Sequence, residues 1–225
     1  MQTTINYSKE NRTMNKNILL IASTLCCILL LAGQAFAGIT YTFTPTPADV
    51  YDLDHYKYYS WRIDWSLPTD QHIESVTLGF NNIQNWDNNA NDLYVHLLDN
   101  VWNVAPGYVK VGTDDQGGGD YFASSYYYYH YGDQILLKHY EDLPNTPQDI
   151  EYYFSQSDIS VLTDYLGNNN FGVGFDPDCH YYNDGIYLKI ETAANTAPVP
   201  EPATVLLLGS GLVGLAGLRR KQKKS

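Results

Sequence analysis

The sequence predicts an all-β domain, an antiparallel β-sandwich or jelly roll with one short helix, between an N-terminal signal peptide and a C-terminal transmembrane helix. Two observations predict the β domain. Short segments rich in β-branched and aromatic residues recur along the chain, and many of its 21 tyrosines lie in them. Clusters of Asn, Asp and Gly separate these segments, as turns separate antiparallel strands.

Eight segments have the composition and spacing expected of strands. Turn-forming groups such as Asn81-Asn82 and Asn183-Asp184-Gly185 bound them. In chain order the predicted strands are Ile39–Phe43, Tyr56–Trp65, Ile73–Phe80, Leu93–Leu98, Tyr121–Tyr131, Gln134–Tyr140, Phe171–Phe175 and Ile186–Glu191.

One short helix is expected between the predicted strands Gln134–Tyr140 and Phe171–Phe175. Ser157 and Asp158 can cap the first free amide groups of a helix over Ile159–Leu166. Gly167 follows directly, and glycine is the residue that most easily adopts the left-handed conformation at a helix end.

The N-terminal segment has the three parts of a signal peptide. A short start containing Lys16 precedes the apolar run Ile18–Leu31, and the small residues Ala35 and Ala37 follow. This order predicts export and cleavage by signal peptidase after Ala37. Residues 1–13 add nothing to the signal, so positions 1 and 14 are alternative starts. The predicted divisions are therefore 1–37, the domain 38–195 and the tail 196–225.

The C-terminal tail has the order of a membrane-embedded segment. After a small-residue linker, Pro200-Glu201-Pro202 precedes the glycine-rich apolar run Ala203–Leu218. A helix of about sixteen residues is about 24 Å long, slightly short of the hydrocarbon core, so local thinning or snorkelling must complete the span. The chain then ends in a cationic group that favours a cytoplasmic C-terminus and argues against a buried core helix: Arg219, Arg220, Lys221, Lys223 and Lys224.

This order of tripeptide, apolar helix and basic cluster, over about the last 26 residues, resembles the PEP-CTERM sorting signal of Gram-negative bacteria. The resemblance implies export by the general secretory route, a transient stay in the inner membrane and removal of the tail by exosortase, a membrane-embedded cysteine protease. It implies Pro200, Glu201 and Pro202 as the recognised residues, and a destination at the cell surface or in an extracellular polysaccharide matrix. The prolines would hold this segment extended and unpaired. A permanently anchored helix behind a rigid spacer is the alternative.

A second resemblance concerns the end of the domain. Phe171–Glu191 is similar to the final hairpin of some proteins that carry this signal. It implies two strands that close the sandwich, with a specialised loop between them, and assigns no activity.

The charge distribution bears on the choice of ligand. The whole chain has a formal net charge of −12, but residues 38–195 hold five cations against 23 acidic side chains, or about −18. Such a field repels phosphate backbones, so nucleic acid is not an expected partner, and it attracts cations such as Ca²⁺. Acidity that serves solubility alone is the other explanation.

Two groups of aspartates are the candidate Ca²⁺ ligands. Carboxylate and backbone oxygens near glycine-rich turns suit a hard cation, although neither group has EF-hand spacing. Ordinary turns, in which Asp accepts bonds from nearby amides, explain the same pattern. The candidates are Asp114, Asp115 and Asp120 in one group and Asp176, Asp178 and Asp184 in the other.

A run of tyrosines offers a second type of site. On an extended strand, Tyr127, Tyr129 and Tyr131 would share one face, where their rings could stack on sugars. Half-buried strand packing accounts for the same run. Polysaccharide is therefore an alternative partner.

No arrangement of residues points to catalysis. The six histidines include no HExxH pair, and the chain has no GxSxG elbow. Cys179 and His180 are neighbours whose side chains would point to opposite faces of a strand, and Cys179 is the one cysteine left after signal cleavage. We therefore predict no catalytic residue and no enzymatic activity.

Three functions remain, in order of preference. The first is a non-catalytic component of the cell surface or extracellular matrix, sorted through its tail. The second is a secreted carbohydrate-binding module that uses tyrosines and Ca²⁺. The third is an extracellular glycoside hydrolase, which requires two facing carboxylates with a raised pKa.

Overall fold

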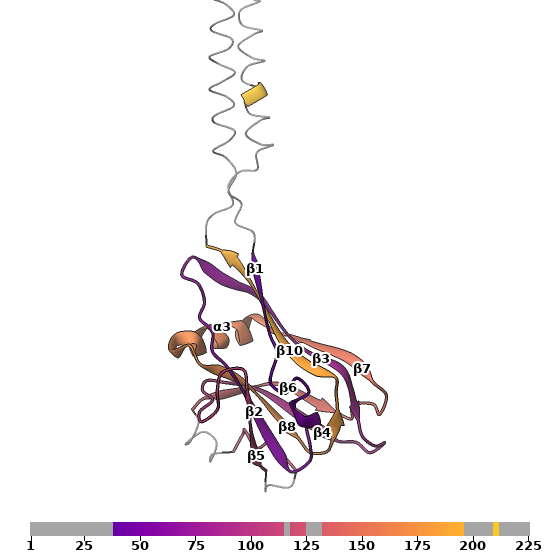
Figure 1. The fold of residues 1–225 in the computed structure, drawn as a ribbon. Helices are drawn as coiled ribbons and strands as arrows, with labels where there is room; N and C mark the ends of the chain where they lie inside the picture. Colours follow the sequence, from indigo (N-terminus) through magenta and orange to yellow (C-terminus); the bar gives the residue numbers. More distant parts are fainter. Residues whose placement is uncertain (1–37, 115–117, 125–131, 196–208, 212–225) are drawn as a thin grey trace, which may run out of the picture. The chain divides into compact units, whose positions relative to one another are not determined.

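The computed structural model describes residues 38–114, 118–124, 132–195 and 209–211 (Figure 1). Residues 38–195 belong to one compact unit, and residues 209–211, which are helical, belong to a second one. Within the described ranges, no helix has both the length and the apolar character needed to cross a membrane. The predicted signal peptide lies outside these ranges, as does the predicted transmembrane helix apart from residues 209–211.

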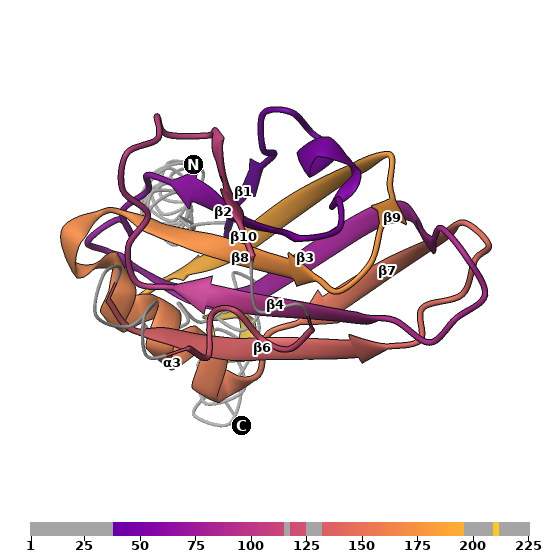
Figure 2. The ribbon, with the colours of Figure 1, turned by 90° about the horizontal axis from the view of Figure 1, so that it is seen from below.

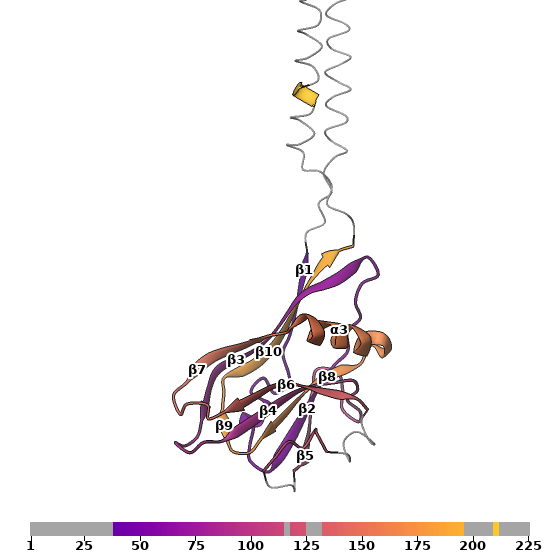
Figure 3. The same cartoon turned by 180° about the vertical axis from the view of Figure 1, so that it is seen from behind.

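Two antiparallel sheets make up the domain (Figures 1 and 3). The first has the order β1-β10-β3-β7, and β9 pairs with the far end of β3. Its strands are β1 (Ile39–Phe43), β3 (Gln71–Asn85), β7 (Gln148–Tyr153), β9 (Tyr181–Tyr182) and β10 (Gly185–Ala194).

The second sheet has the order β5-β2-β8-β4-β6, with β4 and β6 side by side along one margin (Figure 2). Its strands are β2 (Lys57–Ile63), β4 (Asp92–Leu98), β5 (Val109–Thr113), β6 (Gln134–Glu141) and β8 (Phe171–Pro177). The α-helix is α3 (Gln156–Tyr165), and short 3-10 turns are η1 (Val50–Asp52) and η2 (Leu166–Asn168).

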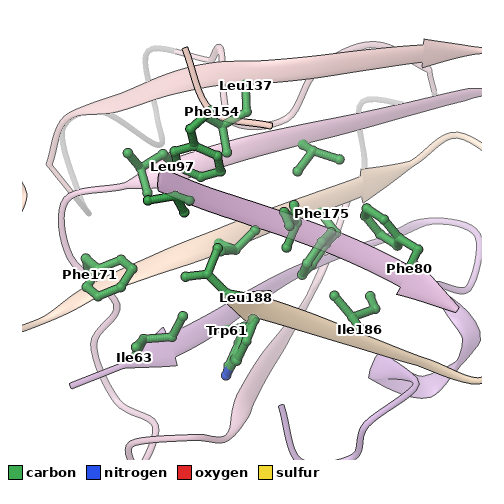
Figure 4. Packing of buried hydrophobic residues seen from close by; sticks show 14 of the residues in the cluster. Trp61, Ile63, Phe80, Leu97, Leu137, Phe154, Phe171, Phe175, Ile186 and Leu188 are labelled. Atoms are coloured by element: carbon green, nitrogen blue, oxygen red, sulfur yellow. The ribbon is translucent and has the colours of Figure 1, made fainter. Parts of the chain in front are cut away.

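The two sheets share one hydrophobic core. Trp61, Phe171 and Phe175 from the second sheet belong to the same buried cluster as Phe80 and Leu188 from the first (Figure 4). The rings of Phe80 and Phe175 meet edge to face across the layers, with centroids 5.8 Å apart. This architecture confirms the predicted mostly-β domain with antiparallel sheets and one short helix.

The central strand β8 is buried on both faces, because a second apolar cluster covers the outer side of its sheet. Phe171, Val173 and Phe175 point into the shared core, so the alternating residues Gly172, Gly174 and Asp176 face outward. The outer cluster consists of Tyr58, Leu98, Val101, Tyr121 and Phe122. Residues 118–124 therefore lie against the outer face of the second sheet.

Several predicted elements differ from the structure. Tyr121–Tyr131 was predicted as a strand, but residues 121–124 form turns and residues 125–131 lie outside the described ranges. The prediction missed β5, β7 and β9. Because β5 and β7 lie at the edges of their sheets, only some of their side chains are buried. Their sequences therefore lack the dense apolar pattern of β8.

The helix and the last hairpin also differ in detail. The cap of α3 is Ser155, two residues before the predicted Ser157, and Asp158 completes a capping box with it. Gly167 is not the left-handed residue; the chain continues through η2 and Asn169 takes that conformation, with φ 61°. The strands within Phe171–Glu191 do not form a hairpin, because β8 and β10 belong to different sheets.

Candidate cation-binding site

Four of the six candidate aspartates gather at one end of the second sheet. Strands β5 and β8 are both antiparallel to β2, so they run in the same direction and end at the same edge. Asp114 follows β5 directly, and Asp176 lies near the end of β8. Asp178 comes just after β8, and Asp120 lies in the segment packed on the outer face. Asp115 lies outside the described residues, and Asp184 lies elsewhere.

Aromatic packing places residues 118–124 over this edge. The Phe122 ring lies against Gly174, where a Cβ would come within 2.7 Å of the ring. The ring of Tyr121 stacks on that of Tyr58, with centroids 3.9 Å apart and planes 11° from parallel. These two contacts hold Asp120 and the backbone N–H of Tyr121 next to the end of β8.

Asp176 is the most constrained of the four carboxylates. It has no exposed surface, and its Oδ2 accepts a hydrogen bond of 2.7 Å from the N–H of Tyr121. Its Oδ1 is buried and has no hydrogen-bond partner among the described residues. The pKa of Asp176 is raised to about 8, chiefly by burial and also by the charges of Asp114, Asp178 and Asp120, against the lowering effect of the Tyr121 hydrogen bond.

Asp178 continues the negative cluster beyond the strand. Its Oδ1 accepts a 3.2 Å hydrogen bond from the N–H of Gly119, and its own N–H donates to the carbonyl of Asp92 at 2.9 Å. Its pKa is raised, chiefly by burial and then by the charges of Asp92 and Asp114; the Gly119 hydrogen bond acts in the opposite direction. Burial and the neighbouring carboxylates therefore both disfavour the ionised form of Asp178.

Asp120 is oriented by several donors. Its Oδ1 accepts from the N–H groups of Phe122 at 3.1 Å and Ala123 at 3.2 Å. The Nε2 of His96, a side chain only 1% exposed, lies 2.9 Å from its Oδ2. The other ring nitrogen, Nδ1, is 2.5 Å from Oε1 of Gln134, so the imidazole is held at both ends.

A smaller acidic group next to this site was not found from the sequence. Asp92 on β4 lies opposite Glu141 on β6, and Nε2 of His139 is 2.7 Å from Oδ1 of Asp92. One ligand atom from each of the three lies within 4.8 Å of the others. The group is partly exposed, and the His139 ring stacks on Tyr94 at 4.2 Å. Only the register of β4 against β6 brings these side chains together, so the separate strand sequences could not reveal them.

Asp184 lies in a different feature, a polar groove of about 570 Å³. Its Oδ2 accepts a 2.7 Å hydrogen bond from Nδ2 of Asn82, and Tyr182, 42% exposed, forms part of the wall. The groove is lined by Asp49, Asp52, Asn82, Gln84, Pro147, Tyr182, Asn183 and Asp184.

An unusual backbone conformation forms one side of the groove. The four residues Val50 to Leu53 all have positive φ, at 51°, 56°, 57° and 41°. A left-handed conformation costs roughly 1–2 kcal/mol per non-glycine residue, so it persists only where its surroundings impose it. Complete burial of Val50 and Leu53 holds this turn, and Nδ2 of Asn183 donates to the carbonyl of Asp49 at 2.8 Å.

The remaining predicted site residues lie outside the described ranges or are engaged separately. Tyr127, Tyr129 and Tyr131 fall outside them, as do all the sorting and cleavage residues: Ala35, Ala37, Pro200, Glu201, Pro202, Arg219, Arg220 and Lys221. The sulfur of Cys179 accepts a 2.9 Å hydrogen bond from Nε1 of Trp86, whereas Nδ1 of His180 lies 3.2 Å from Oδ1 of Asp54. The two neighbours therefore interact with different partners.

Comparison with known families identifies the tail. The PEP-CTERM protein-sorting motif matches residues 198–221, which confirms the resemblance found in the sequence. The motif implies processing by exosortase and association with a membrane, and it marks the chain as an exported protein. It does not extend into the β domain. A search of curated proteins found no match.

Two solved structures show a distant likeness to this chain. A latent aurone synthase (polyphenol oxidase) from its natural source is 9% identical, with a TM-score of 0.35 over 72% of this chain and 29% of that one. A latent apple tyrosinase is 11% identical, with a TM-score of 0.29 over 71% and 26%. This chain thus spans less than a third of either protein. Similarity at this level does not bear on the chemistry of the chain.

Proposed function

We propose that this chain is a non-catalytic protein of the cell surface or extracellular matrix, from which exosortase removes the C-terminal tail. The sorting motif at residues 198–221 is the observation that carries this proposal. Pro200-Glu201-Pro202 would be the recognised segment, because its two prolines keep the chain extended and without backbone pairing.

The charge of the chain fits such a destination. Removal of the signal peptide and the tail takes away eight of the 13 cations, including the five at the C-terminus. The domain that remains has a net charge of about −18. A processed protein of this charge would stay soluble and would attract cations from its surroundings.

Burial of Asp176 supports a non-catalytic role. A glycoside hydrolase needs two acids that face a bound sugar, one of them with a raised pKa. The pKa of Asp176 is raised to about 8, but none of its surface is exposed, so no sugar can reach its oxygens. In the groove, the carboxylates of Asp52 and Asp184 already accept hydrogen bonds from the N–H of Asn183 and the amide of Asn82.

Mass spectrometry of the protein from the surface fraction of its native host tests the sorting proposal. We expect an N-terminus at Gly38 and a C-terminus before the apolar run at residues 203–218. Replacing Pro200 and Pro202 together with Ala should leave the tail attached. Pro144→Ala, the same change at an exposed position of the β domain outside the matched motif, should not prevent processing. Recovery of the wild-type surface protein with its sequence intact to Ser225 would contradict the proposal.

Saccharide binding is a second candidate function, favoured by the groove beside β9. The exposed ring of Tyr182 could stack on a sugar, and the carboxylate and amide groups around it could bond to hydroxyls. Tyr127, Tyr129 and Tyr131 remain sequence-based candidates for the same role.

Binding of the host's own surface polysaccharide tests this second function. Tyr182→Ala should weaken binding at least about tenfold, which corresponds to the loss of one well-placed ring contact. Tyr153→Ala, a change at a ring that is 68% exposed on edge strand β7, is the matched control and should bind as the wild type does. Equal binding by Tyr182→Ala and the control would remove this candidate.

A further inference from the structure

Among the described residues that line the groove beside β9, acidic side chains are present and basic ones are absent. Three of the eight are the aspartates Asp49, Asp52 and Asp184, and none is Lys, Arg or His. A fourth carboxylate lies beside the groove, since Oδ1 of Asp149 accepts a 2.9 Å hydrogen bond from the N–H of Asn82, a lining residue. The groove therefore favours a ligand with positive charge and disfavours one with negative charge.

In the part of the chain that the structure describes, no ion pair involves a carboxylate of the groove. The ion pairs found there are made by other acids: Asp54, Asp64, Asp92, Asp120 and Glu191. The β domain as a whole carries a net charge of about −18. A cationic group on a ligand would therefore enter the groove along a field that already attracts it.

The carboxylates of Asp52 and Asp184 are oriented by hydrogen bonds and still have room for a ligand. Oδ1 of Asp52 accepts from the N–H of Asn183 at 3.3 Å, and Oδ2 of Asp184 accepts from Nδ2 of Asn82 at 2.7 Å. An ionised carboxylate offers about four positions for hydrogen-bond donors. Because Asp184 is exposed and Asp52 is half-buried, both present positions that a bound ligand can reach.

Asn183 joins the two chain segments that form the acidic side of the groove. Only 6% of this residue is exposed. Its Nδ2 donates to the carbonyl of Asp49 at 2.8 Å, and its Oδ1 accepts from the N–H of Gly185 at 3.0 Å. Together with the buried side chains of Val50 and Leu53, these bonds fix the acidic wall before a ligand arrives. A wall that is already ordered loses less entropy on binding.

Tyr182 adds an aromatic surface to the groove. Its ring is 42% exposed, and the ring of His180 supports it by an edge contact, with centroids 4.5 Å apart and planes at 69°. Gln84 lies opposite Tyr182 in the pair of β3 and β9 and also lines the groove. The C–H groups of a sugar ring can stack on the aromatic ring, and its hydroxyls can bond to the side-chain amide. The ring, the amide and the carboxylates together match a sugar that carries amino groups.

We propose that this groove selects saccharides with protonated amino groups, with Tyr182 stacked on a sugar ring and Asp52 and Asp184 bonded to ammonium groups. The inference rests on saccharide binding, the second candidate function above, and names the class of saccharide. Neutral saccharides bind through the same ring with lower affinity, and saccharides with carboxylate groups are repelled by the aspartates. A lysine-rich peptide has the same charge, but it lacks the sugar ring that stacks and the hydroxyls.

Isothermal calorimetry of the purified full-length protein in detergent tests the selection with two probes of equal length. These are the hexamers of β-1,4-linked glucosamine and of β-1,4-linked glucose, which differ only by an amino group in place of a hydroxyl. At about pH 6, below the usual pKa of a primary amine, the glucosamine hexamer should bind at least about tenfold more tightly. This advantage should shrink as NaCl is raised from about 0.05 to about 0.5 M. Equal affinity for the two hexamers at low salt would overturn the inference.

The double variant Asp52→Asn, Asp184→Asn removes charge and keeps an oxygen for each existing hydrogen bond. It should lose the preference for glucosamine and bind the glucose hexamer as the wild type does. Asp164→Asn, the same change at an exposed position of α3, is the matched control and should keep the preference. If the double variant does not fold, Asp184→Asn alone, at an exposed position, should reduce the preference at least about threefold. A folded variant with the full preference would contradict these ligand contacts.

Tyr182→Ala separates a failure of this inference from a failure of saccharide binding. The change should weaken binding of both hexamers by similar factors of at least about tenfold, and so preserve the preference between them. If the wild type binds both hexamers equally and Tyr182→Ala weakens both, saccharide binding stands and selection for amines is wrong. If the wild type binds neither hexamer, both the second candidate function and this inference are wrong.

Hexalysine tests whether the groove attracts any flexible cation. It should bind more weakly than the glucosamine hexamer, because it offers no sugar ring to Tyr182. Binding of hexalysine at least as tight as that of the glucosamine hexamer, with neither affected by Tyr182→Ala, would show attraction of cations in general and would rule out a saccharide site.

Discussion

The Phe122 ring lies directly on Gly174, in the space that a side chain at position 174 would occupy. A Cβ there would be 2.7 Å from one ring atom and 2.9 Å from two more. Gly174 faces outward from the central strand β8, next to the outward-facing Asp176. The missing side chain thus allows residues 118–124 to reach the sheet and bring Asp120 to the aspartate cluster.

Gly174→Ala should displace Phe122 and destabilise the domain by about 1–3 kcal/mol, the usual cost of overpacking. Urea unfolding monitored by circular dichroism measures the change. Gly167→Ala is the matched control, since no atom lies within 4 Å of a Cβ at position 167. The control should be neutral or slightly stabilising. A neutral Gly174→Ala would show that Phe122 does not rest on the sheet in solution.

Phe175→Ala should lower the free energy of unfolding by about 3–5 kcal/mol, because the side chain is fully buried between the two sheets and its removal leaves a cavity. Thermal and urea unfolding both report this loss. The exposed Tyr153→Ala change should stay within about 0.5 kcal/mol of the wild type. Similar small effects at both positions would contradict a shared core between the sheets.

Ser155→Ala should lower the free energy of unfolding by about 1 kcal/mol. Ser155 caps the first turn of α3, and its side chain accepts a hydrogen bond from the N–H of Asp158. Ser160→Ala, at an exposed position inside the same helix, should leave stability unchanged or raise it slightly. Urea unfolding of the two variants measures the difference. If both serines behave alike, the helix does not begin at the observed cap.

Asp99→Asn should stabilise the domain at pH 7, by less than about 1 kcal/mol since Asp99 is partly exposed. Burial, followed by the charge of Asp133, raises the pKa of Asp99 in the folded state. Below the unfolded pKa, near 3.8, both states hold the proton and the penalty vanishes. The penalty develops as the pH rises through the higher folded pKa, and Asn never acquires it.

Urea unfolding of wild type and Asp99→Asn at pH 3.5, 5 and 7 checks this sign. The stability difference should be smallest at pH 3.5 and largest at pH 7. The exposed Asp164→Asn change serves as control and should show much less variation with pH. A gain from Asp99→Asn that is the same at all three pH values would exclude charge burial as its cause.

Part of the domain could be read from local sequence alone. The core strands have dense apolar patterns, and seven of the eight predicted strands overlap observed strands, such as Ile39–Phe43 and Leu93–Leu98. The local pattern did not predict β5 and β7, because at the edge of a sheet about half of the side chains face water. It also failed at residues 121–124, whose aromatic rings pack on the outside of a sheet instead of forming a strand.

The sequence predicted which aspartates were candidates, but not which of them lie near one another. The sequence indicated six candidate residues in two groups, and the structure combines members of both groups and separates Asp184 from them. Neither the burial of Asp176 nor its contact with Tyr121, 55 residues away, has a local signal. The same holds for His96, which the sequence showed only as one of six scattered histidines.

By itself the sequence determined the sorting tail and the mostly-β class, because each depends on the order or alternation of residues close together in the chain. The tertiary structure decided which aspartates meet. Asp114 and Asp176 become neighbours since β5 and β8 share the partner β2, and Asp120 joins them since Phe122 fits over Gly174. Contacts between such distant residues follow from strand pairing and packing, which short stretches of sequence do not contain.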